Sequence, residues 1–165
     1  MRDNPIMLFM PQQPADQSIN QRVRAIILTD SCKLLFIRRE KPNKPPYWVA
    51  PGGGVEDKDA DLLSCLHREL FEELGACVDV VAHAFELRHH KGGKNLEEHF
   101  YICRLMSYDL SQRNGPEFDD PSRGAFIPQE VEIDPATLRG LDFKTPELCD
   151  WIIDNLHHLR ERLAG

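Results

Sequence analysis

The segment from residue 61 to residue 75 sets the strongest limit on how this chain can fold. It repeats leucine at three- and four-residue steps, at Leu63, Leu66, Leu70 and Leu74. This period predicts an amphipathic helix over residues 61–74, with its leucine face packed on a core. Gly75 comes just after the last leucine, where a residue in the left-handed conformation commonly ends a helix.

The polar side of this helix concentrates negative charge. At about 100° per residue, Glu69, Glu72 and Glu73 project from neighbouring positions on one side. Each like-charged pair costs an isolated helix roughly 0.2–0.5 kcal/mol, and Arg68 alone offers local relief. A solvated surface is the usual outcome for a charge cluster, and a hard divalent cation is the alternative. The glycines upstream, at 52–54, favour the cation because their backbone can approach an ion closely.

Composition and charge narrow the class of protein. With 165 residues, 41% of them hydrophobic, the chain suits one ordinary domain. A net charge of −7 argues against nucleic acid as a partner and means that an anionic ligand needs local cations. The five cysteines include no CxxC pair, so we expect reduced thiols. No apolar run reaches the length of a membrane span, and the N-terminus lacks a signal-peptide pattern, which predicts a cytoplasmic protein without a membrane partner.

Prolines and apolar runs divide the chain into an arm and one domain. Residues 1–20 contain several prolines and glutamines and predict an extended arm, followed by a domain over residues 21–165. Apolar β-type runs predict strands at residues 23–29, 33–38, 47–49, 78–87 and 99–105. Asp30 and Ser31 separate the first two runs, which predicts a hairpin.

The remaining segments predict two loops and a final helix. The glycines at 52–54 predict a loop, and the polar residues 107–123 predict a long loop that sets specificity. Thr145 and Pro146 predict the start of a last helix. Its apolar stripe consists of Leu148, Trp151, Ile152, Leu156, Leu159 and Leu163.

The segment from Gly53 to Ala76 resembles the signature of the Nudix hydrolase family, G-x5-E-x7-R-E-U-x-E-E-x-G-U, where U is apolar. The second half matches at Arg68, Glu69, Leu70, Glu72, Glu73, Gly75 and Ala76. The resemblance implies an α/β/α sandwich on a mixed β-sheet over residues 21–165. It also implies an Mg²⁺- or Mn²⁺-dependent hydrolase that cleaves a nucleoside diphosphate linked to a group X into a nucleoside monophosphate and phospho-X.

The resemblance also assigns roles to individual residues. It implies that Glu69, Glu72 and Glu73 are metal ligands and catalytic groups, and that the Gly53 carbonyl adds an oxygen ligand. In the first half of the signature the carboxylate position falls on Ala60 when counted from Gly54, and on Asp59 when counted from Gly53. We favour Gly53 and Asp59, with one residue inserted before the helix, because this keeps an acidic group. Asp59 is then expected to pair with Arg68 and brace the loop.

Other polar residues are weaker candidates. Glu69 or Glu73 ranks first as the general base, and Glu97 and Glu98 come next, although both are expected at the surface near a strand start. Glu98 is also a candidate for substrate binding.

Arg38 and Arg39 either grip a phosphate or form a solvated strand end. Four histidines lack cysteines at ligand spacing, so we expect polar positions rather than zinc ligands at His83, His89, His90 and His99.

The alternative function is a non-hydrolytic domain that senses a nucleotide or nucleotide-sugar. The three glutamates argue against it, since a sensor has no need of a full set. Homodimers are common in the family, so the resemblance makes a homodimer possible. The substrate subfamily is not identifiable from the sequence.

Overall fold

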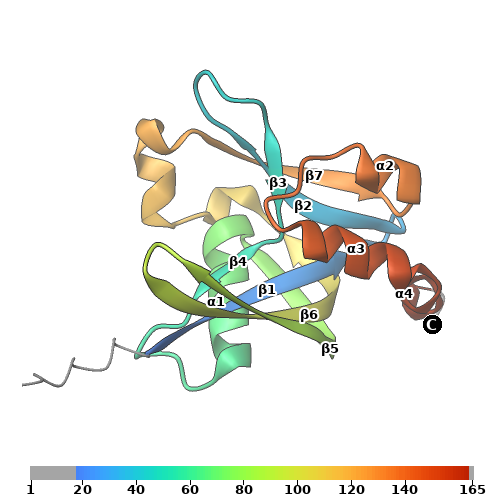
Figure 1. Cartoon of the computed structure of the whole chain (residues 1–165), viewed down its shortest axis with the longest axis horizontal. Helices are drawn as coiled ribbons and strands as arrows, with labels where there is room; N and C mark the ends of the chain where they lie inside the picture. Colours follow the sequence, from blue (N-terminus) through green and yellow to red (C-terminus); the bar gives the residue numbers. More distant parts are fainter. Residues whose placement is uncertain (1–17, 164–165) are drawn as a thin grey trace, which may run out of the picture.

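The computed structural model describes residues 18–163, which form helices on both faces of one sheet (Figure 1). The strands are β1 Ile19–Leu28, β2 Lys33–Glu40, β3 Tyr47–Val49, β4 Gly52–Gly54, β5 Ala76–Lys91, β6 Lys94–Tyr108 and β7 Ala125–Glu132. The helices are α1 Leu62–Leu74, α2 Pro135–Arg139, α3 Pro146–Asp154 and α4 Leu156–Leu163. The arm expected at residues 1–20 lies mostly outside the described residues, and β1 begins at Ile19.

The sheet is mixed, with strand order β3-β2-β1-β6-β5 and with β4 and β7 attached to β1 and β2. Strands β1 and β6 pair in parallel, and the other pairings of these seven strands are antiparallel. The turn at Asp30 and Ser31 joins β1 to β2 as an antiparallel hairpin, as expected. The α/β/α class on a mixed sheet is therefore confirmed.

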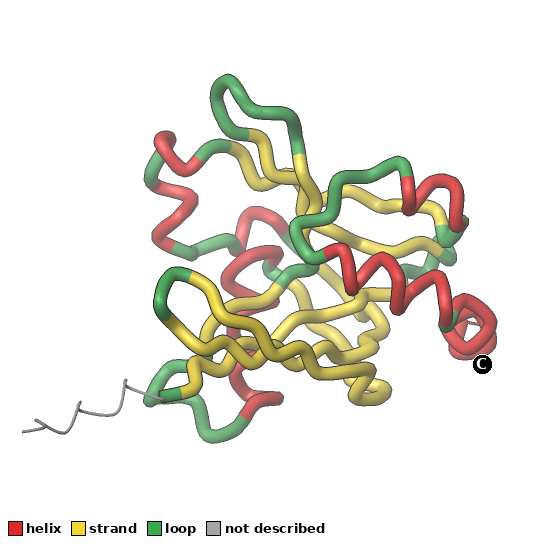
Figure 2. The backbone as a smooth tube through the Cα atoms, viewed as in Figure 1, coloured by secondary structure: helices red, strands yellow, loops and turns green. Residues whose placement is uncertain are grey.

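Each face of the sheet has its own apolar core because side chains alternate along the strands. Val23, Ala25 and Ile27 of β1 pack with Leu66, Leu70 and Leu74 of α1. The expectation that Leu63 also faces this core is wrong, because Leu63 is 41% exposed. On the opposite face, Ile26 and Leu28 pack with residues of α2, α3 and α4. Figure 2 shows the helices on the two sides of the strands. The sheet thus holds α1 in a fixed position against β1 and β4.

Three expectations about secondary structure are wrong. Residues 52–54 form strand β4, not a loop, because glycine lets this backbone pair closely with β1. The polar segment is not a loop without structure, because it contains three 3-10 turns, Leu110–Gln112, Pro116–Asp119 and Pro121–Arg123. The strand β7 and the short helix α2, which the sequence does not predict, follow it. The last helix is two helices, since Asn155 ends α3 and its side chain donates to the Trp151 carbonyl at 2.8 Å.

Two further observations concern the cysteines and the lengths of the helices. The described cysteines are free, with Cys65, Cys103 and Cys149 buried. Within residues 18–163, no helix is both long and apolar enough to cross a membrane.

Candidate active site

The helix α1 begins and ends where its sequence requires. Asp61 is the N-cap, and its carboxylate accepts a hydrogen bond from the Ser64 amide at 2.7 Å. Gly75 ends the helix in the left-handed conformation, with φ of 58°. A Cβ atom at Gly75 would lie 1.9 Å from the Asp109 carbonyl oxygen, so a side chain there would collide with the following segment.

The segment after β6 closes over the C-terminal end of α1. The Arg113 guanidinium donates to the Glu73 carbonyl at 2.7 Å, and the Asn114 amide donates to the Glu72 carbonyl at 3.2 Å. These carbonyls belong to the last turn of the helix, where the backbone leaves acceptors without partners inside the helix. Arg113 also donates to the Phe126 carbonyl at 2.8 Å, which ties the same segment to β7. The polar segment is therefore held in place by the helix end.

Arg68 is the cation at the centre of the carboxylate face. Its guanidinium donates to both oxygens of Asp59 at 2.8 Å, a bidentate pair, and to the Gly54 carbonyl at 3.2 Å. The same side chain contacts the carboxylates of Glu69 and Glu72, each at 3.2 Å. The hydrogen bonds from Arg68 hold the pKa of Asp59 well below its usual range. Arg68 thus links the loop before α1 to two glutamates of the helix.

The glycines of β4 bring backbone up to the other glutamates. A Cβ atom at Gly53 would lie 2.4 Å from the Glu69 carboxylate, so a side chain there would displace that carboxylate. The Gly52 amide donates to the Glu73 carboxylate at 3.0 Å. The carboxylates of Glu69 and Glu73 therefore lie against the strand that contains the expected carbonyl ligand.

The electrostatics of this face favour a bound cation. Burial raises the pKa of Glu73 to about 8, against the opposing charge of Arg24 and the Gly52 amide. Burial also raises the pKa of Glu69, although Arg68 opposes the shift. A bound divalent ion would compensate the negative charge of these carboxylates, which burial otherwise disfavours. Glu69, Glu72, Glu73 and the Gly53 carbonyl form an all-oxygen donor set, which fits magnesium or manganese.

The glutamates are not drawn together into a single ligand cluster. Among the described residues, only one group of three ligand-type side chains has its ligand atoms within 4.8 Å of one another, and it lies elsewhere. Arg68 holds Glu69 and Glu72, whereas Gly52 holds Glu73. Magnesium commonly keeps several waters and uses one or two carboxylates with substrate phosphates, so this spacing suits an ion that the substrate completes.

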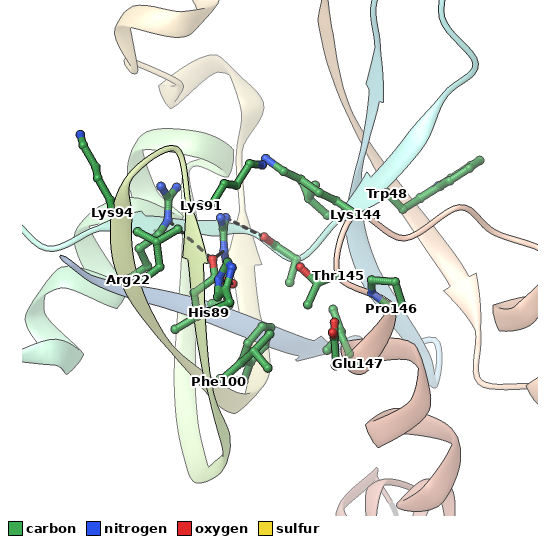
Figure 3. Close-up of a pocket in the computed structure, with 17 residues that line it drawn as sticks. Arg22, Trp48, His89, Lys91, Lys94, Phe100, Lys144, Thr145, Pro146 and Glu147 are labelled. Atoms are coloured by element: carbon green, nitrogen blue, oxygen red, sulfur yellow. Dashed lines mark hydrogen bonds and ion pairs between the residues drawn. The ribbon is translucent and has the colours of Figure 1, made fainter. Parts of the chain in front are cut away.

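A pocket of about 430 Å³ opens on the face of the sheet opposite α1 (Figure 3). Its walls come from β1, β3, β5, β6 and the start of α3. Most of its charged side chains are cations: Arg22, Arg24, Lys91, Lys94 and Lys144. Glu98 and Glu147 are its carboxylates.

The pocket cations are crowded. Burial lowers the pKa of Lys144, and the charges of Lys91, Arg24 and Arg22 lower it further. Arg24 connects the pocket to β4, because its guanidinium donates to the Ala50 and Gly52 carbonyls at 3.3 Å each. An anion in the pocket would relieve this repulsion. These cations supply the local positive charge that the net charge of the chain lacks.

Comparison with known proteins decides the family. A family model described as the NUDIX domain matches residues 19–143. The chain belongs to the Nudix family. It is therefore a Nudix pyrophosphohydrolase, an enzyme that acts on the pyrophosphate bond of nucleotide derivatives. No curated protein matches the sequence.

Solved Nudix structures share the fold at low sequence identity. A NUDIX hydrolase from Nitrosomonas europaea superposes with a TM-score of 0.64 at 18% identity, covering 86% of this chain and 90% of that one. The MutT protein from Methanosarcina mazei Go1 gives a TM-score of 0.63 at 17% identity, covering 87% and 96%. A structure titled UDP-X diphosphatase gives 0.63 at 18% identity, covering 88% and 66%.

A fourth carboxylate, in the polar segment, acts electrostatically on the Nudix helix. Glu117 lies in the 3-10 turn Pro116–Asp119, and its negative charge contributes to raising the pKa of both Glu69 and Glu73. Sequence reasoning missed Glu117 because it lies far along the chain from Glu73, in a segment outside the Nudix signature. Only the docking of the segment through Arg113 brings it close.

We expect Glu117→Gln to slow hydrolysis by this Nudix enzyme about 100-fold if Glu117 accepts the proton of the attacking water. The change keeps the side-chain shape but removes the charge. Steady-state rates of the parent and the variant measure the effect. Asp119→Asn, an exposed carboxylate in the same turn, is the control. Equal losses in the two variants would count against a role for Glu117.

The candidate arginines lie apart from the pocket in the Nudix fold. Arg38 pairs with Glu40, and Arg39 donates to the Arg123 carbonyl at 2.6 Å and stacks on Phe126. Neither Arg38 nor Arg39 lines the pocket.

The expectation that Glu97 and Glu98 lie at the surface is wrong. They are 7% and 5% exposed, because β6 begins earlier than predicted and is flanked by β1 and β5. Glu98 lines the pocket and pairs with Arg24 at 3.2 Å.

Proposed function

We propose that this Nudix protein hydrolyses the pyrophosphate linkage of a nucleoside diphosphate derivative with Mg²⁺ or Mn²⁺. The products are a nucleoside monophosphate and phospho-X. One observation carries the proposal: Gly52 of β4 donates its amide to the Glu73 carboxylate and accepts a hydrogen bond at its carbonyl from Arg24, which lines the cation-rich pocket. One structural neighbour is titled UDP-X diphosphatase, a substrate of the same class, although that likeness is one of fold.

Each part of the site has a task in this reaction. Glu69, Glu72, Glu73 and the Gly53 carbonyl would hold the ion, which screens the pyrophosphate and acidifies a water. The pocket cations bind the negative groups of the substrate and orient its scissile bond towards β4. Glu117 or Glu69 accepts the proton of the attacking water, because burial and neighbouring carboxylates raise the pKa of Glu69 and make it a stronger base. Arg68 and Asp59 support the loop behind the glutamates.

A hydrolysis screen tests the proposal. Nucleoside diphosphate derivatives are incubated with the full chain and Mg²⁺ or Mn²⁺, and products are read by mass spectrometry. Release of a nucleoside monophosphate with phospho-X, lost in Glu69→Gln, is the expected result. Calorimetric binding of a nucleotide without turnover in either metal would instead support the sensing alternative. The homodimer and the cytoplasmic location stay predictions from the sequence.

The proposed role of the pocket in substrate binding can be tested at Lys144. We expect Lys144→Met to raise KM about tenfold with little change in kcat, since one charge-assisted hydrogen bond to the substrate is worth about 1.5 kcal/mol or more. Lys144 lines the pocket beside Thr145 and Pro146 at the start of α3 (Figure 3). Lys58→Met, an exposed lysine paired with Glu56, is the control. A fall in kcat with unchanged KM would place Lys144 in the reaction rather than in binding.

A further inference from the structure

A second set of metal-type side chains lies away from the carboxylate face and the pocket. Glu86 of β5 and Glu97 and His99 of β6 place ligand atoms within 4.8 Å of one another, the one such group within residues 18–163. His83 of β5 adjoins them, with its ring centroid 5.7 Å from that of His99. We propose that His83, Glu86 and His99 bind a divalent transition-metal ion of the zinc class, with Glu97 as the positioning residue.

Two of the distances in this set suit ligands of one small ion. His99 Nδ1 lies 3.4 Å from His83 Nε2 and 3.8 Å from Glu86 Oε2. Zinc bonds to nitrogen and oxygen of about 2.0–2.1 Å place tetrahedral ligand atoms roughly 3.4 Å apart. His83 lies outside the group whose ligand atoms are within 4.8 Å of one another, so its ring must move towards Glu86 to close the set around an ion, with a fourth position open to water. Two imidazoles and one carboxylate favour zinc and similar ions over magnesium, which prefers oxygen alone.

Glu97 orients the buried histidine for this role. Its carboxylate lies 2.7 Å from His99 Nε2, so it accepts a hydrogen bond from the proton on that nitrogen. The lone pair of Nδ1 then faces His83 and Glu86. Glu97 is itself fixed by Gln21 at 3.1 Å and by Arg88 at 3.1 Å. A histidine ligand whose second nitrogen bonds a carboxylate is the usual outer shell of a zinc site.

An irregularity in β5 puts its two ligands on one face of the sheet. On a regular strand, residues three apart such as His83 and Glu86 point to opposite faces. The ladder with β6 shifts register between His83 and Phe85, so that His83 lies opposite Tyr101 and Glu86 opposite His99. The bulge thus aims both side chains to the same side as His99.

The group is separate from the catalytic carboxylates. Gly53, Val23, His99 and Glu86 form one row across four strands, in the order β4, β1, β6 and β5. With strands about 4.8 Å apart, the two ends of this row are roughly 14 Å from each other. His83 and Glu86 are exposed on the edge strand, which leaves the group open to ions from solvent.

No local sequence pattern indicates this set. The histidines lack nearby cysteines, so polar positions are the expectation. The missing ligands are carboxylates that the pairing of β5 with β6 supplies.

Zinc titration by calorimetry tests the proposal on the full chain, in excess Mg²⁺ to occupy the catalytic carboxylates. We expect one Zn²⁺ per chain, and with Co²⁺ the intense visible absorption of a tetrahedral site. His83→Gln and Glu86→Gln should each weaken Zn²⁺ binding at least about tenfold, and Glu97→Gln about 10–100-fold. His90→Gln is the matched control, since His90 is an exposed histidine on the same strand that bonds Asn95.

Several outcomes would overturn the proposal of a zinc-class site. The proposal fails if no Zn²⁺ binds, or if His83→Gln and Glu86→Gln bind it as the parent does. It also fails if Glu69→Gln or Glu73→Gln abolishes Zn²⁺ binding, because the ion would then belong to the catalytic face. Thermal unfolding without metal confirms that the two exposed variants fold. No substrate enters the measurement, so its failure is distinct from failure of the hydrolase proposal.

Discussion

Glu73→Gln is expected to lower hydrolysis at least about 100-fold, because in the proposed function it removes one anionic ligand from an ion that contributes several kcal/mol to the transition state. The same substitution should stabilise the metal-free fold at alkaline pH. Burial raises the pKa of Glu73 to about 8 from an ordinary 4.5, so the folded protein retains a proton that the unfolded chain loses. That contribution to stability is complete below pH 4.5 and is lost as the pH rises through about 8.

Chelator removes the metal, so the effect of the buried carboxyl can be measured alone. Under these conditions the parent should lose on the order of 2 kcal/mol relative to Glu73→Gln between about pH 5 and about pH 9. Thermal unfolding of both proteins across this range measures the difference. Glu132→Gln, which changes an exposed carboxylate, should stay parallel to the parent. Added Mn²⁺ should then stabilise the parent and not Glu73→Gln. Parallel curves for all three proteins would contradict a raised pKa for the buried Glu73 carboxyl.

Alanine at each of the three consecutive glycines of β4 is expected to give three different results. Gly53→Ala puts a Cβ 2.4 Å from the Glu69 carboxylate, and the flexible end of that side chain can move away. The fold should stand, while the displaced ligand lowers hydrolysis and Mn²⁺ affinity by about tenfold or more. At Gly54 no described atom lies within 4 Å of where a Cβ would stand, so Gly54→Ala should be close to neutral.

Among the three glycines of β4, Gly52 is the one that we expect the fold to require. Its φ is +148°, and a Cβ there would lie 2.0 Å from the Val23 carbonyl oxygen. Gly52→Ala should therefore destabilise the fold, by on the order of 1–3 kcal/mol from backbone strain alone. Mn²⁺ binding by electron paramagnetic resonance and thermal unfolding separate the three effects. If Gly53→Ala kept full Mn²⁺ affinity, the close approach of Glu69 to β4 would have no part in ion binding.

The sequence predicts local features well where one segment contains all the determinants. The leucine spacing, Asp61 and Gly75 define α1 because a helix packs one stripe and is capped by its own neighbours. Strand β7 is not predicted, because Pro128 argues against a strand. Among the described strands β7 pairs with β2 alone, and an edge strand tolerates proline. Helix α2 has five residues, too few to display a period.

The parts of the site that depend on distant contacts could not be predicted. Arg22 and Arg24 alternate with apolar residues on β1 and give no local sign of a shared pocket with Lys144. Their convergence follows from the parallel pairing of β1 with β6 and from the position of α3. Glu117 likewise depends on the docked segment. Sequence patterns report what one element needs, whereas a binding site is assembled from several.

Arg113 couples the C-terminal end of helix α1 to the start of strand β7. One guanidinium holds the last turn of α1 and the first part of β7, so the amides there should exchange with solvent as a single cooperative unit. Opening of the segment that carries Glu117 must then release the helix end beside Glu73. Apart from Glu117, residues 116–123 between these anchors can vary in sequence and reshape what they present to a ligand while their ends stay fixed.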